Sequence, residues 1–121
     1  MSWIPQRIAL LNPDLLGLLT QLGLKEKTSV LETGFENFGE LITSQPDLII
    51  AKSSPSPEIT EKLHKFQIEV LTLDPKSAAE LEEAIIYLGA YAGVFDQAEK
   101  LTESLSKHLK QKKDWKEFLK N

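Results

Sequence analysis

The chain has 121 residues, the length of one domain, and its apolar fraction of 41% is typical of a globular protein and too high for a disordered one. A net charge of −4 and a pI near 5.2 give no reason to expect nucleic acid, whose phosphates favour basic surfaces. Because the chain has no cysteine, disulfides, thiolate metal sites and cysteine nucleophiles are excluded. The opening MSWIPQRIALL lacks the features of a signal peptide, and no apolar run approaches the roughly 20 residues of a membrane span.

Four short apolar runs recur along the first part of the chain, and each ends in polar or turn-forming residues. The clearest is DLIIAK, which stops at Lys52 before a cluster of serine and proline. Short apolar runs bounded in this way predict buried β-strands. The predicted strands cover residues 7–11, 28–33, 47–52 and 69–74.

A helical pattern follows each predicted strand. The first begins near Pro13, a residue allowed in a first helical turn, and ends at Gly23 as its C-cap. Ser56 precedes Pro57 as an expected N-cap, and Ser77 opens a capping-box sequence. The predicted helices cover residues 13–23, 35–45, 56–67 and 77–93.

The alternation of strand and helix with short connections predicts right-handed βαβ units. We therefore expect a three-layer α/β/α fold with a four-stranded parallel sheet in the order 2-1-3-4, within a Rossmann-like lobe over residues 1–93. The strands are almost wholly apolar, as expected when both faces of a sheet are covered. The expected core residues are Leu15, Leu18, Leu22, Ile49, Ile50, Val70, Leu71, Leu81, Ile85 and Leu88.

Residues 94–121 form the second predicted part, an amphipathic helix. Its apolar stripe consists of Phe95, Ala98, Leu101, Leu105 and Leu109, which lie three or four residues apart. Trp115, Phe118 and Leu119 continue this stripe, so we expect one helix from about 95 to 119. Because large aromatic residues are enriched at the energetic centres of interfaces, Trp115 and Phe118 are the expected anchors of a twofold homodimer. The alternative is a tail that folds back on its own domain or frays among its lysines.

Ligands of an open parallel sheet bind beyond the carboxyl ends of the strands. Four polar loops follow the predicted strands, at residues 12–14, 32–37, 52–57 and 74–77. The candidate ligand-binding residues in these loops are Asn12, Asp14, Glu32, Phe35, Glu36, Lys52, Ser53, Ser54, Asp74 and Lys76. Every parallel sheet has such loops, and ordinary turn or helix-start roles also account for Glu36 and Asp74.

The sequence lacks the motifs of common catalytic and nucleotide sites. Neither G-x-G-x-x-G nor G-x-x-x-x-G-K-[ST] occurs. A response-regulator receiver needs clustered acids at its strand ends, whereas the third predicted strand ends in Ala51-Lys52. His64 and His108 have no partner at metal-ligand spacing. Since no nucleophile–base set is visible either, we expect no metal site, no cofactor and no enzymatic activity.

Four segments, in the correct order, resemble the substrate-binding proteins of ABC importers for iron-siderophore, haem and cobalamin. RIALLNPDLLGLLTQLGL resembles the opening strand and Leu-rich helix of that family. FENFGELITSQPDLIIA resembles its next helix and the strand entry after it. LHKFQIEVLTLDPKSAAELEEAIIYLGAYAG resembles the following segment, and QAEKLTESL the start of the long helix that joins two lobes. The resemblance covers nearly the whole chain and implies the first lobe of a periplasmic binding protein.

The sequence also departs from that family. It corresponds to one lobe of a two-lobed clamp, only TSVLET remains of a longer cleft-building stretch, and Gly17 stands where the family has an acid. The chain is thus expected to be an excised lobe, periplasmic or extracellular, or else a natural single-lobe protein in the cytoplasm.

Two functions are compatible with these observations. The first is a non-enzymatic lobe that binds a metal chelate or corrinoid and serves an ABC permease. The second is a single-lobe interaction or assembly module that reuses the half-fold without transport. Neither involves nucleic acid, and neither is embedded in a membrane.

Overall fold

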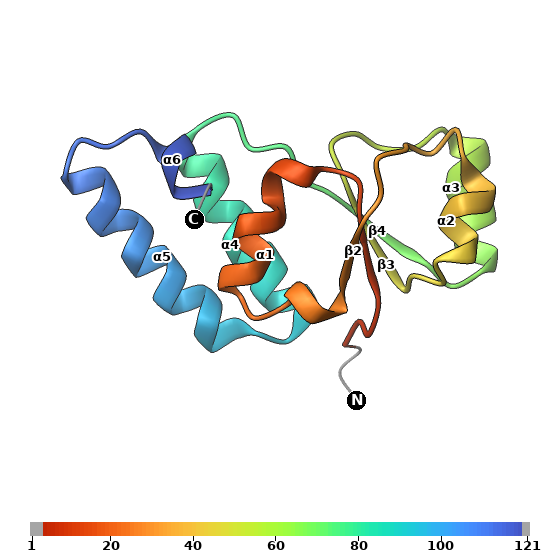
Figure 1. The fold of residues 1–121 in the computed structure, drawn as a ribbon, viewed down its shortest axis with the longest axis horizontal. Helices are drawn as coiled ribbons and strands as arrows, with labels where there is room; N and C mark the ends of the chain where they lie inside the picture. Colours follow the sequence, from red (N-terminus) through yellow and green to blue (C-terminus); the bar gives the residue numbers. More distant parts are fainter. Residues whose placement is uncertain (1–3, 120–121) are drawn as a thin grey trace. The chain divides into compact units, whose positions relative to one another are not determined.

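The protein is described from a computed structural model, which places residues 4–119 (Figure 1). Within these residues, four strands form one parallel sheet in the order β2-β1-β3-β4. The strands are β1 (Ile8–Leu10), β2 (Thr28–Val30), β3 (Leu48–Ala51) and β4 (Glu69–Thr72). The predicted α/β class and the predicted strand order are therefore confirmed.

Helices connect the strands and make up the last part of the chain. They are α1 (Leu16–Gln21), α2 (Phe38–Thr43), α3 (Pro57–Lys65), α4 (Ala78–Ala92), α5 (Phe95–Lys110) and α6 (Trp115–Leu119), with short 3₁₀ turns at Pro13–Leu15 and Lys25–Lys27. Several elements are shorter than predicted. The second strand stops at Val30 because that residue pairs with Leu10, where β1 itself ends.

Two predicted helix starts form through serine caps. The Ser56 hydroxyl accepts a hydrogen bond from the Ile59 N–H at 3.2 Å, and Pro57 opens α3. The Ser77 hydroxyl accepts one from the Glu80 N–H, also at 3.2 Å. The expected capping box differs in its second half, because the Glu80 carboxylate accepts from the Lys76 N–H. Local sequence thus determines where α3 and α4 begin.

The entry to the third strand is fixed by Asp47. Its carboxylate accepts hydrogen bonds from the backbone N–H groups of Gln6 at 2.7 Å and Arg7 at 3.1 Å. Its own N–H donates to the Arg7 carbonyl at 2.9 Å. The Pro-Asp-Leu entry of the sequence therefore aligns β3 with β1 before the ladder begins.

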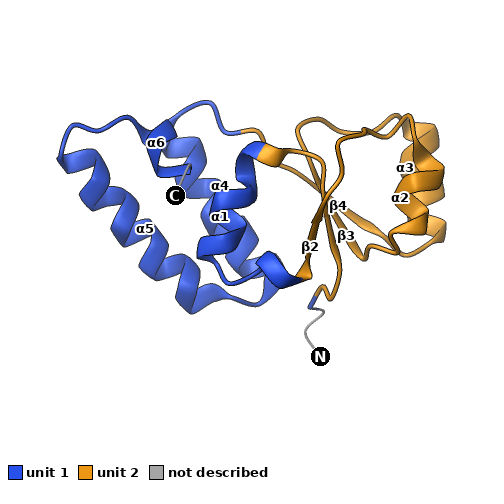
Figure 2. Cartoon of the chain, viewed as in Figure 1, with its two compact units in different colours: residues 1–4, 14–26, 75–121 blue, residues 5–13, 27–74 orange. Residues whose placement is uncertain are grey.

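The chain divides into two compact units (Figure 2). Unit 1 contains α1, α4, α5 and α6, over residues 1–4, 14–26 and 75–121, and unit 2 contains the sheet with α2 and α3, over residues 5–13 and 27–74. The boundary expected between residues 93 and 94 lies inside unit 1. There α4 and α5 approach so closely that a Cβ on Gly89 would collide with the Ala98 side chain.

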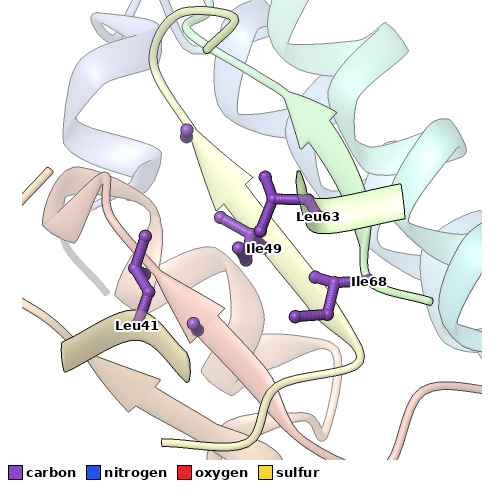
Figure 3. Close-up of a cluster of buried hydrophobic side chains, with 6 residues drawn as sticks. Leu41, Ile49, Leu63 and Ile68 are labelled. Carbon is purple, nitrogen blue, oxygen red and sulfur yellow. The ribbon is translucent and has the colours of Figure 1, made fainter. Parts of the chain in front are cut away.

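In unit 2, α2 and α3 cover one face of the sheet. A cluster of buried side chains comes from β1, α2, β3, α3 and the residue before β4 (Figure 3). Its members are Ala9, Leu41, Ile49, Ala51, Leu63 and Ile68. The predicted core residues are all buried except Val70 and Leu71, which are partly exposed because β4 is an edge strand with one neighbour.

In unit 1, the predicted continuous helix over residues 95–119 is wrong. α5 ends at Lys110, a turn with Lys112 at φ 60° follows, and α6 lies back against α1 and α5. Phe118 is only 6% exposed within this packing. The fold-back alternative therefore describes α6, and in this conformation the Phe118 ring is not free to anchor a dimer.

The cluster in unit 2 generates a stability prediction. Ile49 is fully buried, so Ile49→Ala should lower the free energy of unfolding by about 2–5 kcal/mol, the range for large-to-small changes in a packed interior. The same change at Ile86, which is 46% exposed, should cost less than about 0.5 kcal/mol. Urea unfolding of both variants measures the difference, and equal losses would mean that β3 is misplaced.

Candidate functional site

The carboxyl ends of the strands in unit 2 lie at one edge of the sheet, where the candidate loops begin. Ala51 of β3 pairs with Thr72 of β4, and Leu10 of β1 pairs with both Val30 and Ile50. Backbone hydrogen bonds extend one residue past each ladder, for example from the Leu73 N–H to the Ala51 carbonyl at 2.8 Å. The segments after β1, β2, β3 and β4 therefore start from a fixed frame.

Asn12 links the segments after β1 and β4. Its amide group donates a hydrogen bond to the Leu73 carbonyl at 3.1 Å, and its side chain is 1% exposed. The Oδ1 atom is buried and has no hydrogen-bond partner among the described residues. A buried polar atom without a partner is costly, whereas the hydrogen bond from the same amide to Leu73 stabilises a fixed connection between the two segments.

Ser54 links the segment after β3 to the last residue of β4. Its hydroxyl lies 3.3 Å from the Thr72 hydroxyl at the end of β4. Both residues are exposed, as are Lys52 and Ser53 beside them. This loop thus presents a cation and hydroxyl groups to solvent while one side-chain contact restrains it.

The segment after β2 contains a turn organised around Glu36. Its carboxylate accepts hydrogen bonds from the Gly34 N–H at 3.0 Å and from the Thr33 hydroxyl at 3.4 Å. The N–H of Glu36 itself and then that of Gly34 lower the pKa of this carboxyl, because both stabilise the ionised form. Burial opposes this lowering of the pKa, and the Thr33 hydroxyl adds a smaller contribution to it. The hydrogen bonds of the Glu36 carboxylate therefore stabilise the turn in which this residue lies.

The structure places the remaining candidates differently. Glu32 is exposed after β2, and Asp74 is half-buried after β4. Phe35 packs against the buried cluster of unit 2, so its ring contributes to the core. Asp14 and Lys76 belong to unit 1 and are exposed there. Unit 2 therefore brings eight of the ten candidates to its own loops: Asn12, Glu32, Phe35, Glu36, Lys52, Ser53, Ser54 and Asp74.

Two side chains at this edge were not among the sequence candidates. Thr33 and Thr72 each supply a hydroxyl that pairs with a candidate residue, Glu36 and Ser54 respectively. Thr33 ends the predicted strand over residues 28–33, which was the available signal, whereas Thr72 lies inside the predicted strand over residues 69–74 and its pairing depends on the register between β3 and β4.

The chemistry of this edge is that of polar recognition. Lys52 is the one cation among the eight candidates in unit 2, which also include three carboxylates, an amide and two hydroxyls. Within residues 4–119, no cluster of three or more His, Asp or Glu side chains is arranged to hold a metal ion. In the same residues, no helix has the length and apolar character needed to cross a bilayer.

The Asn12 contact generates a second prediction. Asn12→Ala removes a buried hydrogen bond and should lower the free energy of unfolding by about 1–3 kcal/mol. The matched control is Asn37→Ala, because the Asn37 side chain makes an exposed hydrogen bond to Glu40 at 2.9 Å, and it should cost less than about 0.5 kcal/mol. Chemical denaturation compares the two, and an equal cost would contradict the assigned role of Asn12.

The Glu36 turn generates a prediction on pH. Because the pKa of Glu36 in the folded chain lies below the usual 4.5, the ionised carboxyl stabilises the fold above the unfolded-state pKa. That stabilisation should disappear as the pH falls through the lowered pKa. The stability difference between wild type and Glu36→Gln should therefore shrink from about pH 5 downward. Carboxyl-carbon NMR titration gives the pKa directly, and a value of 4.5 or above would contradict the turn.

No family profile and no curated protein matches the sequence. Solved structures do match it. A possible iron-binding, periplasmic solute-binding protein from Staphylococcus epidermidis is 21% identical with a TM-score of 0.73, covering 90% of this chain and 50% of that one. A periplasmic haem-binding protein from Pseudomonas aeruginosa is 20% identical with a TM-score of 0.73, covering 89% and 46%. The periplasmic vitamin B12-binding protein of Vibrio cholerae is 21% identical with a TM-score of 0.68, covering 88% and 49%.

The chain thus spans about half the length of the proteins it matches. Identities near 20% establish a shared fold and leave the ligand open. The resemblance noted in the sequence is confirmed at this level: the chain has the fold of about half of a periplasmic solute-binding protein.

Proposed function

We propose that this chain is a non-enzymatic binding lobe for an iron chelate, haem or a corrinoid, with its contacts at the carboxyl edge of the sheet in unit 2. The observation that carries the proposal is the fold match over about 90% of the chain to a possible iron-binding, a haem-binding and a vitamin B12-binding protein. Ligands of open parallel sheets meet this same edge.

The loop contacts support a pre-organised surface. Asn12 joins the segment after β1 to the one after β4, and Ser54 joins the loop after β3 to the end of β4. Loops restrained before binding lose less conformational entropy when a ligand arrives. Lys52 is exposed directly after β3 and supplies the positive charge that pairs with the carboxylates of haem or of an acidic siderophore.

The expected affinity is weak for the chain alone. Small-molecule sites usually enclose about 70–90% of their ligand, and one wall encloses much less. The chain corresponds to about half of each matched protein, so a second wall is supplied by another lobe in the proposed function. Transfer to an ABC permease belongs to this proposal as well. The assembly-module alternative is not favoured, since the matched proteins from Staphylococcus epidermidis, Pseudomonas aeruginosa and Vibrio cholerae are solute-, haem- and vitamin B12-binding proteins.

Titration with haemin, cyanocobalamin and a ferric siderophore tests the proposal. We expect backbone amide shifts, followed by NMR, to concentrate in residues 31–37, 52–56 and 73–74 for at least one of the three. Lys52→Ala should weaken haemin binding at least about fivefold, the loss of one charge-assisted contact. The matched control is Lys65→Ala at the end of α3, which should leave binding unchanged.

Two results would count against the binding lobe. Amide shifts confined to unit 1 would remove the carboxyl edge as the site. The absence of any shift with all three ligands at about 1 mM would do the same, because a Kd of that size corresponds to a binding free energy of about −4 kcal/mol. Equal weakening by Lys52→Ala and Lys65→Ala would show non-specific attraction by surface charge.

A further inference from the structure

An apolar surface lies on the side of α4 that faces solvent. Tyr87 is 54% exposed, and Ile86, Ala90 and Tyr91 are exposed on the same side of the helix. The residues that α4 buries lie on its other side. A helix at the surface of a protein usually has charged or polar residues on its outer side. The outer side of α4 departs from this rule.

Two further residues extend this surface at the C-terminal end of α4. Phe95, the first residue of α5, is 59% exposed, and its Cα would lie 3.6 Å from a Cβ placed on Gly89. Ile4 is exposed as well, and its side chain would lie 3.3 Å from a Cβ placed on Gly93. All of these residues belong to unit 1 (Figure 2). The resulting α4 patch consists of Ile4, Ile86, Tyr87, Ala90, Tyr91 and Phe95.

The size of the α4 patch indicates an interaction surface. An aromatic side chain has about 150–250 Å² of surface, so five large side chains that are about half exposed present roughly 400–500 Å². The largest apolar patch of a typical monomer measures about 300–600 Å² and often has a function. The patch is therefore large enough for one face of a short helix. It is small for a stable dimer, which needs about 800 Å² from each copy.

The charges around the α4 patch all have one sign. Residues 77–99 contain five acidic side chains and no lysine, arginine or histidine. Glu82 and Glu83 lie one helical turn before the patch residues of α4, and Glu99 lies one turn after the patch residue of α5. These three carboxylates are exposed, and among residues 4–119 they have no hydrogen-bond or ion-pair partner. Unpaired carboxylates therefore border the patch.

We propose that the α4 patch binds a cationic amphipathic helix of another protein. Such a helix has apolar residues on one side and lysine or arginine along its margins, and it packs lengthwise on an exposed helix face. Its apolar side covers Ile86 and Ala90, and its cations pair with the carboxylates of Glu82 and Glu83. A cation placed over the exposed ring of Tyr87 adds a cation–π contact.

A second copy of this chain is a poorer match for the α4 patch. Two such patches facing each other would bring like charges together, which opposes association. The end of α5 is rich in lysine, but Leu101, Leu105 and Phe118 on the apolar side of the tail are buried within unit 1. The proposed partner is therefore another protein. The proposal concerns unit 1 and does not depend on ligand binding at the carboxyl edge of unit 2.

Two synthetic peptides test the proposal with the full chain. Each is an amphipathic helix of about 14 residues with leucine on one face, and the other face is lysine in one peptide and glutamate in the second. We expect the lysine peptide to bind at least about tenfold more tightly, because the carboxylates around the patch repel the glutamate peptide. Amide shifts followed by NMR should concentrate in residues 82–99.

Substitution of an exposed ring tests the apolar part of the α4 patch. Tyr87→Ser should weaken binding of the lysine peptide at least about fivefold, because the ring contributes apolar area and a cation–π contact. The matched control is Phe66→Ser, which removes a ring that is 56% exposed in unit 2 and should leave binding unchanged. Both rings are exposed, so neither change disturbs the fold.

Reversal of charge tests the acidic border. Glu82→Lys combined with Glu83→Lys should reduce the preference for the lysine peptide to less than about twofold. The matched control combines Glu61→Lys with Glu103→Lys, two exposed positions outside the border. The control changes the net charge equally and should keep the full preference.

The proposal is overturned if the two peptides bind equally tightly, or if neither binds at about 1 mM. Equal weakening by Tyr87→Ser and Phe66→Ser also overturns it. Sedimentation equilibrium and flotation with phosphatidylcholine vesicles test the other occupants. A dimer at about 100 μM, or vesicle binding, that Tyr87→Ser abolishes would assign the α4 patch to a second copy or to a membrane instead.

Discussion

Parallel pairing of β1 with β3 is the constraint on which unit 2 depends. These two strands occupy the middle of the sheet, and every residue in both is buried. Their register is fixed at one end by the Asp47 carboxylate and continues beyond the ladder at the other, where the Leu11 N–H donates to the Ile50 carbonyl at 2.8 Å. Both strands consist of apolar residues and are buried along their whole length. Because the polar loops begin where these strands end, the pairing also fixes where the candidate loops begin.

The same pairing brings Asn12 beneath the candidate edge. An apolar residue at this position would leave the Leu73 carbonyl without its donor, and the amide of Asn12 joins two segments that are far apart in sequence. The connection between Asn12 and Leu73, with that between Ser54 and Thr72, makes the carboxyl edge a more defined surface than loop composition alone would indicate.

Unit 1 obeys a different constraint, the close packing of α4 on α5. Gly89 faces Ala98 where any larger residue would collide, and Gly93 at φ 71° allows the sharp turn that α5 needs to return along α4. Phe118 of α6 is buried in this unit, where its ring packs against His108 near the end of α5. The packing of α4 and α5 is specified by small residues, whereas the packing of α6 is specified by one aromatic ring.

The sequence by itself determined the α/β class, the strand order and the starts of α3 and α4, because hydrophobic periodicity and serine caps act over a few residues. It also identified most of the residues at the carboxyl edge, since strand ends in a parallel sheet define that edge. Only tertiary structure decided that Asn12 is buried and that Asp14 and Lys76 belong to another unit. It alone decided that the tail turns at Lys112. The helical spacing continues through residues 111–114, but the Asp114 carboxylate caps α6 by accepting from the Lys116 N–H, and contacts with Gln21 of α1 and His108 of α5 hold Phe118.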